Sequence, residues 1–173
     1  RQLLEAALTL PQLVGESLDE YATRVIEDSK AQTLKAMERG VECHTAIEEY
    51  ISGVLMGTSL LYKEHCEKVE LVLNQYGIPL RSGKPERSFA SELGYGGKID
   101  YSHDSGTIVD FKTKAFLDKK TKPYDEHLMQ CAAYGYGLFV IRGAFYPRFR
   151  AFNVFVGIDD CEVRVFEHDW RDL

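Results

Sequence analysis

The sequence contains no cysteines at the spacing of a metal site, since its four cysteines, Cys43, Cys66, Cys131 and Cys161, are scattered along the chain. Neither a zinc knuckle nor a disulfide framework is indicated, and a reducing, intracellular setting is the natural expectation. A continuous run of eighteen apolar residues is also missing, and residues 1–16 lack the basic start and apolar core of a secretory signal. We therefore expect no membrane partner.

Positive charge is in deficit as well. The formal net charge of −6 weighs against a nucleic-acid partner, because neutralising phosphates normally requires an excess of lysine and arginine. The distribution of charge matters more than the sum. Residues 112–122 carry five lysines against one aspartate, and residues 142–150 carry three arginines and no acid. These two runs are either solvated surface loops or contacts for a polyanion.

With 173 residues, of which 45% are hydrophobic and 28% charged, the chain resembles an ordinary globular protein that needs no disulfides to hold a core. No repeat or low-complexity segment divides it, so residues 1–173 are predicted to form a single α/β domain. Its first part, 1–77, is helical, and 86–167 supply a mixed sheet with helices on its faces. The expected helices are 16–39, 41–52, 59–76 and 125–140, and the expected strands lie within 86–113, 149–159 and 161–168.

Local signals set several of these boundaries. Ser17 and Glu20 form a capping-box pattern at the start of the first long helix. Gly40, Gly53 and Gly77 each follow an apolar helical stripe and are predicted to end helices.

The stretch 97–114, GKIDYSHDSGTIVDFKTK, carries Asp100 and Asp110 on two neighbouring predicted strands. A two- or four-residue loop would place the two carboxylates on opposite faces of the hairpin. A three-residue loop at 104–106 instead pairs Asp100 directly with Asp110, and Gly106 suits the left-handed position that such a loop requires. In that register Lys112 shares the face of both acids.

Two carboxylates about 5 Å apart repel each other, so a folding argument gives no reason to pair them. A divalent cation removes the repulsion, and Mg²⁺ needs only one or two carboxylates together with water. Lys112 could then orient or deprotonate an attacking water, or neutralise a phosphate. The alternative is a surface hairpin with solvated acids.

At this point the sequence resembles the RecB-type branch of the PD-(D/E)XK nuclease superfamily over residues 39–136. The elements G-x-x-D, D-x-K and Q-x-x-x-Y occur in the family's order. A histidine in the context R-G-x-x-x-H-x-x-I-E lies upstream of them. The residues that carry this resemblance are Gly97, Asp100, Asp110, Lys112, Gln130, Tyr134, Arg39, Gly40, His44 and Glu48. The sequence departs from the family's leading "PD", because Ile99 precedes Asp100.

The resemblance implies a restriction-endonuclease-like core and a Mg²⁺- or Mn²⁺-dependent DNA nuclease, most typically an exonuclease. His44, Asp100 and Asp110 would be side-chain metal ligands, with the Phe111 carbonyl as a further ligand, and Lys112 would be the catalytic lysine. The expected contacts to substrate come from Gln130, Tyr134, Glu86 and Lys114, with Glu92 as a less favoured candidate for the place of Glu86.

Each assignment has a structural alternative. The alternative for His44 is a core histidine with a satisfied ring. The alternative for Gln130 and Tyr134, which lie one helical turn apart, is a structural hydrogen bond. Alternative functions are a structure-selective endonuclease, a catalytically silent DNA-binding or assembly module, and a metal-binding module without DNA. The histidines at 65, 103, 127 and 168 stand in no motif and are interpreted as incidental.

Overall fold

Residues 2–140 and 149–169 are described by the computed structural model of the chain, which divides into two units, Arg1–Val41 and Glu42–Leu173. A single domain over residues 1–173 therefore stays a prediction. Most of the basic run 142–150 lies outside the described residues. No helix in the described part of the chain combines the length and the apolar character that crossing a membrane requires.

Helix α2, Leu18–Ile51, is one 34-residue helix where the sequence predicted two. It begins at the predicted capping box, in which the Ser17 N–H donates to Glu20 Oε2 at 2.9 Å. The predicted stop at Gly40 is wrong. A glycine inside a helix costs only about 1 kcal/mol relative to alanine, and helix α2 runs on to a last turn whose apolar side chains are buried. Gly53, with a φ of 76°, marks the end that was predicted.

A short helix that the sequence did not predict, α1 (Gln2–Thr9), precedes α2 in the first unit. The Tyr21 hydroxyl of α2 donates to the carbonyls of Ala7 at 2.9 Å and Leu10 at 3.1 Å. These two bonds satisfy carbonyls at the end of α1 that have no partner inside the helix.

The second unit contains one five-stranded sheet in the order β1-β2-β3-β4-β5. Its strands are β1 (Lys84–Ala90), β2 (Gly96–His103), β3 (Thr107–Lys114), β4 (Arg150–Gly157) and β5 (Val163–His168). Strands β3 and β4 are parallel, and the other neighbours are antiparallel. The crossover between β3 and β4 runs through α5, Asp125–Gly135. The predicted α/β class with a mixed sheet is confirmed.

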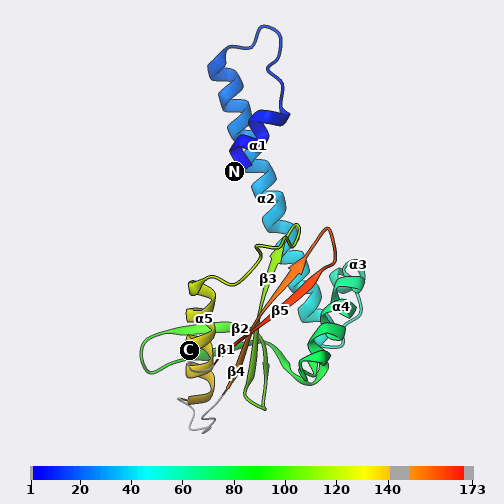
Figure 1. Ribbon diagram of the computed structural model, residues 1–173, viewed down its shortest axis with the longest axis vertical. Helices are drawn as coiled ribbons and strands as arrows, with labels where there is room; N and C mark the ends of the chain where they lie inside the picture. Colours follow the sequence, from blue (N-terminus) through cyan, green and yellow to red (C-terminus); the bar gives the residue numbers. More distant parts are fainter. Residues whose placement is uncertain (1, 141–148, 170–173) are drawn as a thin grey trace. The chain divides into compact units, whose positions relative to one another are not determined.

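Helices cover both faces of this sheet, with α4 on one side and α5 on the other (Figure 1). The predicted helix 59–76 is divided into α3 (Thr58–Leu61) and α4 (Lys63–Gln75), and it ends at Gly77 as expected. The predicted helix 125–140 is α-helical only to Gly135 and finishes as a π-turn, Tyr136–Val140.

The hairpin between β2 and β3 has the predicted three-residue loop. The Gly106 N–H donates to the His103 carbonyl at 3.0 Å, and Gly106 adopts a φ of 87°. His103 pairs with Thr107. This is the register that sets Asp100 opposite Asp110.

Candidate active site

Strands β2 and β3 separate at the level of the two aspartates. Their described ladder ends at the pair Tyr101 and Val109, whereas on their other edges β2 stays paired with β1 as far as Gly96 and β3 with β4 as far as Lys114. The separation leaves the Phe111 N–H facing a gap, and Asp100 Oδ2 accepts it at 2.7 Å. The N–H and C=O of one strand residue point to the same side, so the Phe111 carbonyl faces the same gap.

Asp110 stands at the centre of the site, with only 3% of its surface exposed. Lys112 Nζ donates to Asp110 Oδ1 at 3.0 Å, and Asn153 Nδ2 donates to Oδ2 at 2.7 Å. The lysine also donates to Gln130 Oε1 at 3.0 Å. Three elements, β3, β4 and α5, therefore bring these polar side chains together beneath α5.

Asp110 lies close enough to Asp100 to affect the ionisation of Asp100. Burial, followed by repulsion from Asp110, raises the pKa of Asp100 to about 6. His44 Nδ1 on α2 lies 3.8 Å from Asp100 Oδ2. Burial lowers the pKa of His44, which keeps its ring neutral and able to bind a metal at neutral pH.

These residues fit a cation that takes few protein ligands. Asp100, Asp110 and the carbonyl of Phe111 offer oxygen atoms at the gap, and Mg²⁺ accepts one or two carboxylates while keeping several waters. A complete side-chain shell is not formed. In the described part of the chain, no three His, Cys, Asp or Glu side chains are grouped closely enough to hold a metal ion. His44 Nδ1, 3.8 Å from Asp100 Oδ2, lies beside these oxygen atoms.

Gln130 and Tyr134 extend the site along α5. Gln130 Nε2 donates to the Tyr134 hydroxyl at 2.7 Å, so both predicted residues belong to the same hydrogen-bonded chain as Lys112. The Tyr134 ring packs edge-to-face on Phe89. A Cβ at Gly97 would lie 2.6 Å from the Tyr134 ring, so the glycine of G-x-x-D makes room for the tyrosine of Q-x-x-x-Y.

The other two predicted substrate contacts lie at the edges of this cluster. Glu86 stands in β1 between the residues that pair with Tyr101 and Ile99, which places it opposite Asp100, and it forms an ion pair with Lys98. Its φ of 52° is unusual for a non-glycine residue. Lys114 Nζ lies 5.6 Å from the ring centre of Phe155, which is the register partner of Lys112 in the pairing of β3 with β4.

Sequence reasoning did not single out Asn153, and it interpreted His168, which contacts Asn153, as incidental. Asn153 is fully buried, and its Oδ1 accepts from His168 Nε2 at 2.6 Å. The carboxylate of Asp110 can only accept, so the amide must turn its NH₂ toward Asp110 and its oxygen toward the histidine. His168 therefore carries its proton on Nε2. The available signal was a lone amide in the apolar run 151–156 of β4.

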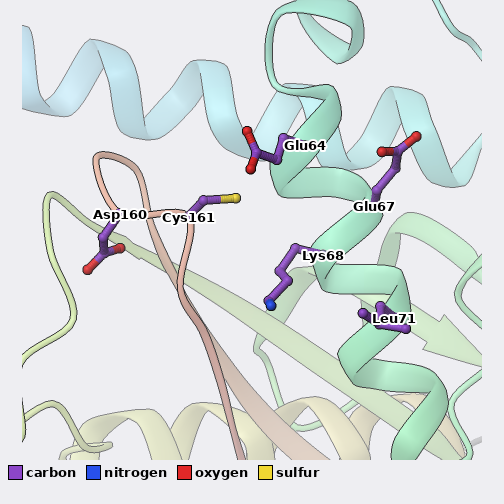
Figure 2. Close-up of a pocket in the computed structure, with 6 residues that line it drawn as sticks. All are labelled: Glu64, Glu67, Lys68, Leu71, Asp160 and Cys161. Carbon is purple, nitrogen blue, oxygen red and sulfur yellow. The ribbon is translucent and has the colours of Figure 1, made fainter.

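A separate hollow of about 370 Å³ lies between α4 and the turn that joins β4 to β5 (Figure 2). Its lining residues are Glu64, Glu67, Lys68, Leu71, Asp160 and Cys161. None of them is a predicted site residue, and three carboxylates against one lysine do not suit a phosphate. The Asp160 carboxylate is already bonded to the backbone N–H groups of Leu117 and Glu162.

No family model matches the chain, and no curated protein matches its sequence.

Proposed function

We propose that this chain is a divalent-metal-dependent DNA nuclease of the RecB-type PD-(D/E)XK kind. One observation carries the proposal: Lys112 contacts both Asp110 and Gln130 beside a second carboxylate, Asp100, whose ionisation Asp110 opposes. Packing gives no reason for two mutually repelling acids at the gap between β2 and β3, whereas a cation gives one.

Each residue has a role in the proposed reaction. Asp100, Asp110 and the carbonyl of Phe111 would hold Mg²⁺ or Mn²⁺, with His44 at their edge. When bound, such a cation lowers the pKa of a coordinated water and offsets charge on the phosphoryl oxygens. The Lys112 ammonium faces the same site, where it can orient the attacking water or neutralise a phosphate oxygen.

The remaining polar side chains position these groups. Gln130 fixes the Lys112 ammonium, and Tyr134 fixes the Gln130 amide. Asn153 donates to Asp110 Oδ2, and Lys112 Nζ lies against both carboxylate oxygens, 3.0 Å from Oδ1 and 2.9 Å from Oδ2. The resemblance favours an exonuclease over a structure-selective endonuclease.

A second candidate is a catalytically silent DNA-binding module of the same fold. This candidate is favoured because Lys112 and Asn153 donate hydrogen bonds to the two oxygens of Asp110. Neither oxygen is therefore free to bind a metal in this arrangement. The nuclease requires that a metal ion can displace Lys112 from the Asp110 carboxylate, whereas the silent module does not.

The test is cleavage of single- and double-stranded DNA labelled at either the 5′ or the 3′ end, in Mg²⁺, Mn²⁺ or EDTA. The wild type is expected to cleave only with metal. Asp110→Ala and Lys112→Ala should each lower the rate by at least about 10²-fold. Lys63→Ala, an exposed lysine of α4, is the matched control and should cleave like the wild type.

Folded wild-type protein that shows no metal-dependent cleavage of any substrate would overturn the nuclease proposal. If that protein binds DNA without cutting it, the silent module replaces the nuclease. Ladders that shorten from one labelled end identify an exonuclease, whereas internal fragments identify an endonuclease.

A further inference from the structure

The loop between β3 and α5, residues 115–124, exposes two aromatic side chains. The exposed fraction is 64% for Phe116 and 58% for Tyr124. Aromatic side chains are usually buried, because each hides a large apolar area on folding. Two in one short loop form a surface on which planar groups can stack.

Four lysines lie close to these two aromatic residues in the sequence. They are Lys114, Lys119, Lys120 and Lys122, and none of them forms an ion pair within the described part of the chain. The acid of the loop is Asp118, whose carboxylate is bonded to the Thr121 hydroxyl at 2.9 Å and to the Lys120 N–H at 3.1 Å. Two further acids, Asp125 and Glu126, lie beyond the loop in the first turn of α5, where they suit the helix dipole.

The loop is fixed to the sheet rather than loosely attached. Its Leu117 side chain is buried, and the Leu117 N–H donates to Asp160 Oδ2 at 2.9 Å. Arg164 of β5 donates to the Leu117 carbonyl at 2.9 Å and also to the Asp118 carbonyl. Phe116, next to this anchor, is therefore held outward by an ordered backbone, and less entropy is lost when a ligand covers it.

Ring contacts connect the loop with the candidate active site. The Tyr124 ring lies 5.4 Å from the ring of His127, which lies 5.9 Å from the ring of Phe155. Phe155 is the register partner of Lys112 in the pairing of β3 with β4. Lys114 Nζ lies 6.0 Å from the Tyr124 ring centre. A strand crossing this loop would run toward Lys112.

We propose that residues 114–124 bind single-stranded DNA, with bases stacked on Phe116 and Tyr124 and phosphates against the lysines. The inference rests on the proposed function and names its substrate class. Stacking selects single strands because duplex bases are already stacked on one another, whereas every unpaired base presents a face to an aromatic ring. The lysines supply the charge that the acidic chain lacks elsewhere.

The test is equilibrium binding of labelled thymidine 12-mers, measured by fluorescence anisotropy without metal. The protein is the full chain with Lys112→Met, which prevents cleavage. The three probes are a normal single strand, the same strand with abasic sites, and a duplex. The normal strand should bind at least about 10-fold more tightly than the abasic strand, because the two share their phosphates but only one can stack.

Phe116→Ser and Tyr124→Ser, added separately, should each weaken binding of the normal strand by about 5- to 100-fold and leave binding of the abasic strand unchanged. Leu60→Ser on α3 is the matched control, because Leu60 has the same 64% exposure as Phe116. Replacing Lys119, Lys120 and Lys122 with alanine should weaken both strands equally. It should also reduce the slope of log affinity against log salt by about 2.

The stacking proposal would be overturned if the parent protein and both aromatic variants each bound the normal and the abasic strand with equal affinity. It would also be overturned if the parent bound the duplex more tightly than the normal single strand. Failure of the nuclease proposal looks different. In that case the wild type cleaves nothing in Mg²⁺ or Mn²⁺, while the loop variants still change binding of the normal strand.

Discussion

The two faces of the sheet in the second unit are built from the same strands but carry different chemistry. Toward α4, β3 and β4 direct Val109, Phe111, Phe152, Val154 and Val156, all buried and apolar. Toward α5, the alternate positions of the same strands carry Asp110 and Lys112 on β3 and Asn153 on β4. Of these three polar residues, Asp110 and Asn153 are buried.

The difference separates folding from function. The α4 face gains stability mainly by removing apolar area from water. The α5 face contains a buried charge and an amide that must be satisfied by hydrogen bonds, which is an arrangement that folding alone does not favour. Substitutions of the apolar residues on the first face should therefore change stability alone, whereas those of the polar group on the second should also change binding and chemistry.

The largest effect on stability is expected for Phe152→Ala on the α4 face. Phe152 is fully buried and packs edge-to-face with Tyr76. Removing the ring should lower the free energy of unfolding by about 3–5 kcal/mol, measured by urea denaturation. The fraction that stays folded should retain the wild-type cleavage rate, and a folded but inactive variant would contradict the division between the faces.

Asp100→Asn should change the pH dependence of stability. The pKa of Asp100 is raised from 3.8 to about 6, so its contribution to the stability of the metal-free protein is fully present below about pH 4 and is lost as the pH rises through 6. Asparagine carries no charge but can still accept the Phe111 N–H. The variant should therefore be more stable than the wild type by about 2–3 kcal/mol at pH 7 and equal to it near pH 4. Denaturant unfolding at both pH values measures this difference, and equal stability at pH 7 would count against the buried pair.

A smaller stability loss, with a larger loss of activity, is expected for Asn153→Ala. The variant leaves Asp110 Oδ2 without its buried partner, at a cost of about 1.5–3 kcal/mol, and frees the carboxylate to turn. Cleavage should fall by at least about 10-fold in kcat with little change in KM. The control is Val154→Ala, the next residue on the opposite face, which should lower stability and leave kcat unchanged. Equal kcat values for the two variants would contradict the proposal that Asn153 positions the Asp110 carboxylate.

Much of this arrangement could be predicted where the signal is local. Gly106 gave the loop length and with it the register of the hairpin, which in turn placed Asp110 and Lys112 on one face. The caps of α2 and α4 followed from Ser17, Gly53 and Gly77. These features depend on residues a few positions apart, whose backbone preferences are strong.

The rest depends on contacts between distant segments. Asn153 meets Asp110 only because β4 lies parallel to β3 in one particular register, and His168 reaches Asn153 only from β5. The pattern of β4 alone shows an amide in an apolar run without naming its partner. Gly40 was misread for the opposite reason, since its local preference to end a helix was overridden by the continuation of α2.

The account depends most directly on a divalent cation bound between Asp100 and Asp110, and proton release on metal binding tests it. The measurement is calorimetric titration of Mn²⁺ into the full chain, repeated in buffers of different ionisation enthalpy at pH 6 and pH 8. Because the pKa of Asp100 is about 6, binding should release about half a proton at pH 6 and almost none at pH 8. Asp100→Asn should abolish the release at pH 6. A wild type that binds no Mn²⁺, or that releases the same number of protons as Asp100→Asn, would contradict the account.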